Sequence, residues 1–174
     1  MSAEENSYNL INLNNNNKIN SDDKNSMPCN LEAEQSFLGA ILFDNTTIEK
    51  IMDLIKDYHL YEPLHQEIYQ ACLILFDNNK LADPTTLKGY LRDKNPNRKI
   101  DISDYLNKLK GSVLSISNIS SYANEIKNCY LRRCLVKISD NIKENSLNIK
   151  IDASPEDLIE RAEESLFNLA EKDR

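Results

Sequence analysis

The sequence predicts an all-α protein in which a compact helical globule is followed by a long helical hairpin and one further helix. Apolar residues recur at steps of three and four through most of the chain beyond residue 30. Only three of the 174 residues are glycine, and strands joined by tight hairpins rely on glycine. Asparagine, aspartate, serine and proline stand where these helices would begin, as helix starts require.

The first 27 residues predict a disordered tail. Met1–Met27 is polar and contains the run Asn14–Asn17. Such a segment buries too little apolar surface to offset the entropy lost on ordering.

Five helices are predicted for the globule. The first begins at Leu31, with Asn30 as its cap and Leu31, Leu38, Ile41 and Leu42 on one face. The others are assigned from their apolar spacing and start signals: Ile48–Ile55; Pro63 to Asn78, with Leu64, Ile68, Ala71, Cys72 and Leu75 inward; a helix opened by Asp83 and Pro84; and a helix capped by Ser103.

Two longer helices follow. No glycine or proline interrupts residues 118–145, and the apolar stripe there is Ile119, Tyr122, Ile126, Tyr130, Cys134, Ile138 and Ile142. A helix of that length outruns a small globule, so its stripe needs a partner. Ser154, Pro155 and two acids then open a last helix, whose stripe is Leu158, Ala162, Leu166 and Leu169.

The net charge of −7 argues against non-specific binding of duplex DNA, because a surface that attracts phosphates is basic. One local basic group lies on the long helix at Lys127, Arg132, Arg133 and Lys137. We interpret it as a solvated helix face; contact with DNA or with an acidic partner is the alternative.

No catalytic or metal-binding set is recognisable, and we expect no cofactor. The sequence has no phosphate-binding loop, so we expect no ATP hydrolysis by this chain. Cys72, Cys129 and Cys134 lack metal-ligand spacing and are interpreted as small core or interface residues in a reducing compartment, with a zinc site as the alternative. No run is apolar enough to span a membrane, and we expect a cytoplasmic protein.

His65 is the one residue that suggests chemistry. It follows Pro63 at a helix start, near Tyr58 and Tyr61. We interpret it as a packed or capping histidine because no activating partners are visible, and we expect both tyrosines to pack in the core rather than to stack on bases. Gly39, inside the first helix, suggests close helix packing.

Four segments together resemble the N-terminal domain of DnaB-type replicative DNA helicases. They are LEAEQSFLGAIL at 31–42 after Met27-Pro28, YHLYEPLH at 58–65, NISSYA at 118–123, and the last helix near Ser154. The resemblance covers about residues 27–174 in order and spacing. One departure is Asp101-Ile102, which stands where many relatives carry a glycine-rich turn.

The resemblance implies a domain that assembles the helicase. Residues 28–148 would form a collar domain, with a hairpin at about 105–111 leading into 118–145, and 154–174 a linker helix. Such domains form a trimer of dimers and receive primase, and the linker docks on a neighbouring subunit's motor domain, which carries ATP and Mg. Little direct DNA binding is implied.

Two sets of residues follow from this resemblance. The subunit interface would use Ile119, Tyr122, Ile126, Tyr130, Cys134 and Ile138. The docking stripe would be Leu158, Ala162, Leu166 and Leu169. The alternative is a free-standing adaptor that modulates helicase or primase assembly through the same residues; a nucleic-acid-binding module would need a basic face.

Overall fold

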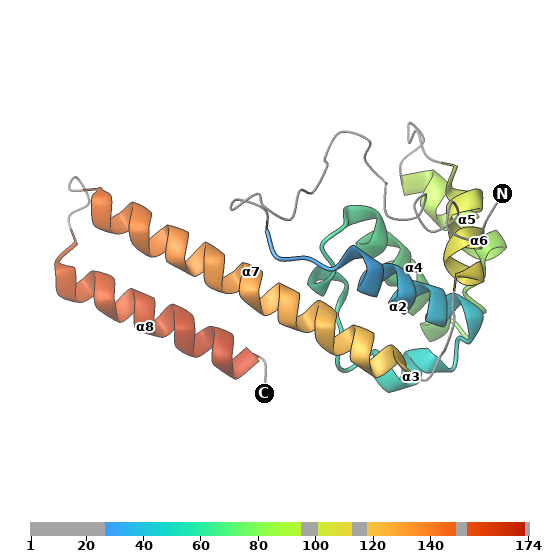
Figure 1. The fold of residues 1–174 in the computed structure, drawn as a ribbon, viewed down its shortest axis with the longest axis horizontal. Coiled ribbons are helices and arrows are strands. Elements are labelled where there is room, and N and C mark those ends of the chain that lie inside the picture. Colours follow the sequence, from blue (N-terminus) through green and yellow to red (C-terminus); the bar gives the residue numbers. More distant parts are fainter. Residues whose placement is uncertain (1–26, 95–100, 113–117, 149–152, 173–174) are drawn as a thin grey trace. The chain divides into compact units, whose positions relative to one another are not determined.

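Every regular element in the described part of the chain is helical, which confirms the predicted fold class. The computed structural model describes residues 27–94, 101–112, 118–148 and 153–172, so the predicted disordered tail lies almost wholly outside the described residues. The helices are shown in Figure 1: α2 (Leu31–Phe43), α3 (Thr47–Ile51), η1 (Asp57–His59), α4 (Pro63–Asp77), α5 (Pro84–Lys94), α6 (Ile102–Gly111), α7 (Ile119–Leu147) and α8 (Pro155–Lys172).

The chain divides into two compact units, and the division falls inside α7. The first unit ends at Lys127 and the second begins at Asn128. The expected boundary near Asn148 remains a prediction about the family's domains. In the structure, α8 is grouped with the second part of α7 rather than standing alone.

Helix α2 is the central helix of the first unit. Asn30 caps it as predicted, because its side chain accepts a hydrogen bond of 3.0 Å from the backbone N–H of Ala33. Phe37 and Ala40 are buried together with Leu38, Ile41 and Leu42, whereas Leu31 is only half-buried. The predicted single apolar face was therefore too narrow: α2 packs against α3, α4 and α6.

Helix α3 is shorter than its apolar spacing suggested. It ends at Ile51, and the chain turns before Ile55 instead of continuing as a helix. Ile48, Ile51 and Ile55 are nevertheless fully buried. The apolar spacing therefore identified the inward side chains correctly. It did not identify the end of the helix, because a turn can also direct such side chains into the core.

Helix α4 agrees with its prediction at both ends. Pro63 occupies its first position, and all five predicted inward residues are buried. Asn79 follows the helix with φ of 55°, a left-handed conformation that asparagine tolerates better than most residues. The N–H of Lys80 then bonds to the carbonyl of Leu75 at 2.8 Å, which closes the helix end.

Aspartates cap the next two helices. The Asp83 carboxylate accepts hydrogen bonds from the N–H groups of Thr85 and Thr86 at 2.7 and 2.9 Å, as predicted for α5. The bond from the Thr86 N–H is the main reason why the pKa of Asp83 lies below its usual value.

The predicted cap of α6 was wrong. Asp101, not Ser103, caps this helix: its carboxylate accepts from the N–H groups of Ser103 and Asp104, and Ser103 lies within the first turn. Asp101 is extended and α6 begins two residues earlier than expected. The buried Tyr105, Leu106 and Leu109 place this helix in the core of the globule, although residues 105–111 were assigned to a hairpin.

In the second unit, α8 runs back alongside the later part of α7 (Figure 1). Ser154 caps the start of α8, as predicted, and Asp157 completes a reciprocal cap. The Ser154 N–H donates to the Asp157 carboxylate at 2.9 Å, and the Asp157 N–H donates to the Ser154 hydroxyl at 3.2 Å.

Within the described ranges, none of the helices is both long and apolar enough to cross a membrane.

The cap of α6 can be tested by comparing Asp101→Ala with Ser103→Ala. We expect Asp101→Ala to lower the free energy of unfolding by about 1 kcal/mol, because two backbone N–H groups lose their acceptor. Ser103→Ala is the matched control and should change it by less than about 0.5 kcal/mol. Urea unfolding followed by circular dichroism measures both; a larger effect at Ser103 would contradict the assignment.

Candidate interaction surfaces

A buried polar cluster lies at the centre of the first unit. Glu34 on α2 and His65 on α4 are 2 % and 0 % exposed, and the carboxylate Oε2 lies 2.6 Å from the imidazole Nδ1. On the other side of the ring, Nε2 lies 2.7 Å from the hydroxyl of Tyr105 on α6. Gln35 donates to the same hydroxyl at 3.4 Å.

The cluster also holds the turn that precedes α4. The Glu34 carboxylate accepts hydrogen bonds from the backbone N–H groups of Tyr61 and Glu62. One proton arrangement satisfies every group: Nδ1–H of His65 donates to Glu34, and the Tyr105 hydroxyl donates to Nε2 while accepting from Gln35. Burial is the main reason why the pKa of Tyr105 is raised.

This geometry indicates a structural role rather than catalysis. All four side chains are buried, so the cluster offers no surface to a substrate. The interpretation of His65 as a packed histidine agrees with the structure, but its aromatic neighbour is Tyr105, stacked nearly parallel with ring centroids 6.2 Å apart. Its partners are 31 and 40 residues distant in sequence, beyond the reach of local patterns.

The expected core packing of Tyr58 and Tyr61 was wrong. Their side chains are 56 % and 39 % exposed. The short helix η1 buries His59 instead, whose Nδ1 accepts a hydrogen bond from the Lys56 N–H at 3.1 Å.

The cysteines and histidines gather into no recognisable site. Across the described ranges, no three His, Cys, Asp or Glu residues lie close enough together to hold a metal ion. Cys72 packs in the core, as interpreted, and burial raises the pKa of its thiol to about 12.

Helix α7 presents two different apolar faces. Ile119 and Ile126, both predicted for a subunit interface, are buried in the core of the first unit, and Tyr122 packs against that core. Beyond Lys127 the apolar side chains lie on a different side of the helix. At about 100° per residue, Ile138 lies about 120° round the axis from Ile126.

The second of these faces is only partly covered. We call it the distal face of α7; it consists of Leu131, Cys134, Leu135, Ile138 and Ile142. Leu135 and Ile142 are 48 % and 38 % exposed, and the other three are half-buried. Of the residues predicted for the interface, Cys134 and Ile138 belong to this face, and Tyr130 is half-buried beside it.

The basic group on α7 is not uniformly solvated. Arg133 is only 8 % exposed and its guanidinium lies 5.8 Å from the centroid of the Tyr130 ring. Arg132 and Lys137 are exposed, and Lys127 is half-buried. The solvated-face interpretation was therefore wrong for Arg133.

Helix α8 also has two apolar sides. Leu158, Ala162 and Leu169 from the predicted docking stripe are half-buried. A second set, which we call the outer face of α8, consists of Ile159, Leu166 and Phe167. Ile159 and Phe167 are 59 % and 64 % exposed, and sequence periodicity did not single them out.

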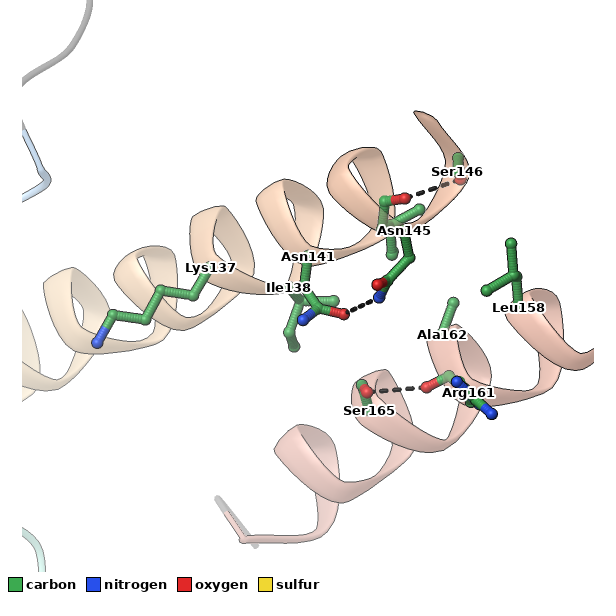
Figure 2. Close-up of a pocket in the computed structure, with 10 residues that line it drawn as sticks. Lys137, Ile138, Asn141, Asn145, Ser146, Leu158, Arg161, Ala162 and Ser165 are labelled. Carbon is green, nitrogen blue, oxygen red and sulfur yellow. Dashed lines mark hydrogen bonds between the residues drawn. The ribbon is translucent and has the colours of Figure 1, made fainter. Parts of the chain in front are cut away.

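A cleft lies between α7 and α8 (Figure 2). Its volume is about 310 Å³, and polar and apolar side chains line it together. The lining residues are Lys137, Ile138, Asn141, Ile142, Asn145 and Ser146 from α7, and Leu158, Arg161, Ala162 and Ser165 from α8.

Comparisons with known proteins agree on one family. The family model described as the DnaB-like helicase N-terminal domain matches residues 26–128. The replicative DNA helicase DnaB of Rickettsia prowazekii is 31 % identical over 160 residues, which are 90 % of this chain and 33 % of that protein. DnaB of Pasteurella multocida is 31 % identical over 83 % of the chain and 31 % of its own length. This chain thus spans about a third of the length of these relatives.

Solved structures show the same fold. The N-terminal domain of DnaB helicase from Mycobacterium tuberculosis matches with a TM-score of 0.74 at 26 % identity, over 82 % of this chain and 99 % of that one. A structure described as a DnaB-like replicative helicase and its interactions with primase matches with a TM-score of 0.63 at 23 % identity, over 80 % of this chain and 31 % of that one.

The buried cluster makes a strong prediction for stability. Glu34→Ala removes the acceptor of three groups and should lower the free energy of unfolding by about 3 kcal/mol. Glu32→Ala is the matched control, because Glu32 is exposed on the same helical turn, and should change it by less than about 0.5 kcal/mol. Urea unfolding measures both. Equal effects of the two substitutions would show that the cluster contributes little to the free energy of unfolding.

Proposed function

Because the chain belongs to the family of DnaB-like helicase N-terminal domains, we propose that it is the assembly and primase-binding domain of a replicative DNA helicase. In this role the chain holds subunits together in a collar and offers a surface to primase. ATP hydrolysis and DNA unwinding would belong to a motor domain, because this sequence contains no phosphate-binding loop.

The observation that carries this proposal is the open apolar surface of the second unit. The distal face of α7 and the outer face of α8 together expose Leu135, Ile142, Ile159, Leu166 and Phe167 by 38–64 %. Large apolar side chains exposed on two helices are a feature of surfaces that oligomers bury. The first unit has a well-packed core of its own, so the second unit is the part that gains most from a partner.

The interface that we propose differs from the one predicted from sequence. Ile119 and Ile126 already have intramolecular partners in the core. Self-association would therefore use Cys134, Ile138 and their neighbours on the distal face, together with the outer face of α8. A dimer formed in this way is the unit from which a trimer of dimers would be built.

Two further partners belong to the same proposal. A solved relative is described as interacting with primase, and we propose that the assembled chain does so too. A neighbouring subunit's motor domain would receive α8. Leu166 is the exposed member of the predicted docking stripe, whereas Leu158 and Ala162 line the cleft.

Self-association can be tested by sedimentation. We expect the wild type to sediment as a dimer or larger, and Ile159→Asp combined with Phe167→Asp to shift it toward monomer, because two carboxylates would replace exposed apolar contacts. Leu81→Asp is the control, since Leu81 is exposed in the first unit. Circular dichroism should remain helical in every variant. A monomeric wild type at high concentration would overturn the proposal.

Primase binding can be tested separately by calorimetry with the primase of the same organism. We expect the wild type to bind, and Leu81→Asp to bind equally well. If primase recognises the assembled form, the Ile159→Asp and Phe167→Asp variant should bind at least about tenfold more weakly. An assembled wild type that does not bind primase would remove primase from the proposal and leave self-association standing.

A further inference from the structure

Two exposed tyrosines lie on the segment that joins α3 to α4, and buried groups fix the backbone that carries them. We call residues 56–62 the tyrosine turn. The side chains of Tyr58 and Tyr61 are 56 % and 39 % exposed. The buried carboxylate of Glu34 accepts hydrogen bonds from the backbone N–H groups of Tyr61 and Glu62. The turn is therefore held from the core, while both aromatic side chains reach solvent.

Tyr58 is also held through its neighbours in the turn. The side chain of His59 is 8 % exposed, and its Nδ1 accepts a hydrogen bond from the Lys56 N–H at 3.1 Å. The ring of Tyr58 packs against this imidazole edge to face, with centroids 4.7 Å apart. The Asp57 carboxylate accepts a hydrogen bond from the Tyr58 N–H at 2.9 Å. A ring supported in this way loses little conformational entropy when it binds a partner, which favours binding.

The charges near the tyrosine turn select the kind of partner. Asp53 is exposed, and Asp57 and Glu62 are half-buried. Lys56 is the one lysine or arginine between residues 51 and 79, and its ammonium group donates to the Met52 carbonyl at 2.8 Å. Such surroundings repel the phosphates of a nucleic acid and attract a cation.

An arginine side chain fits both features of this turn. The face of a tyrosine ring attracts a cation placed over it. The planar guanidinium stacks on an aromatic ring, and its N–H groups can bond to a carboxylate at the same time. Tyrosine and arginine are also the residue types that often contribute most to the free energy of protein–protein binding.

We propose that the tyrosine turn binds an arginine-containing segment of another protein, with a guanidinium group over the Tyr58 ring. Asp53 and Asp57 would supply the carboxylates that pair with this cation. The inference goes beyond the proposed function and does not rest on it. Self-association was assigned to the second unit, whereas the tyrosine turn belongs to the first.

The test uses a short, labelled peptide of alternating arginine and glycine, titrated into the full chain and followed by fluorescence anisotropy. We expect Tyr58→Ala to raise the dissociation constant about fivefold, because the ring is lost, and Tyr58→Phe to leave it within about twofold of the wild-type value. Tyr90→Ala is the matched control, because Tyr90 is 41 % exposed on α5. Equal losses of affinity in the two alanine variants would overturn the proposal.

A second variant tests the charge of the partner. Asp53→Asn should raise the dissociation constant about threefold, because an exposed carboxylate is lost. Asp77→Asn makes the same charge change at the far end of α4 and should have no effect. A peptide with glutamate in place of arginine should not bind. The choice of a cationic partner is wrong if that peptide binds equally well, or if Tyr58→Ala abolishes binding of a single-stranded oligonucleotide.

This proposal and the proposed self-association can fail separately. The Ile159→Asp and Phe167→Asp variant should bind the arginine peptide as the wild type does, because both substitutions lie in the second unit. A monomeric wild type that binds the peptide would overturn self-association and leave this inference standing. A loss of sedimenting mass in Tyr58→Ala would make the tyrosine turn an interface between copies, which overturns this inference.

Discussion

The carboxylate of Glu34 is the interaction on which the first unit depends. From the central helix it accepts hydrogen bonds from the turn before α4 and from His65, and His65 in turn holds Tyr105 of α6. Three helices are thus tied to a single buried charge. An unpaired carboxylate at this depth would be very costly, so the surrounding groups must be in place together for the globule to form.

Local signals explain how much of the fold could be predicted. The caps at Asn30, Asp83 and Ser154 act over three residues or fewer, and all three were identified from sequence. Ser103 alone was predicted to cap α6; Asp101 suits a cap equally well, and its extended backbone in the structure identifies it as the cap. The partners of His65 could not be found, because no local pattern connects residues that are 31 and 40 positions apart.

The interface was predicted less well for a related reason. Apolar steps of three or four along α7 were treated as one stripe, although the residues on the globule and those beyond it lie on different sides of the helix. Burial of Ile126 shows that substituting it would unfold the core rather than separate subunits. The outer face of α8 was missed because Ile159 and Phe167 fall outside the narrow stripe that contains Leu158.

Because Cys72 is buried, its rate of chemical modification reports how often the first unit opens. The thiol is fully enclosed, and with a pKa near 12 it carries almost no reactive thiolate at neutral pH. An alkylating reagent can therefore modify it only while the globule is transiently open. Mass spectrometry can measure the rate of that modification at each residue. The rate gives the frequency with which the core opens under native conditions, without denaturant.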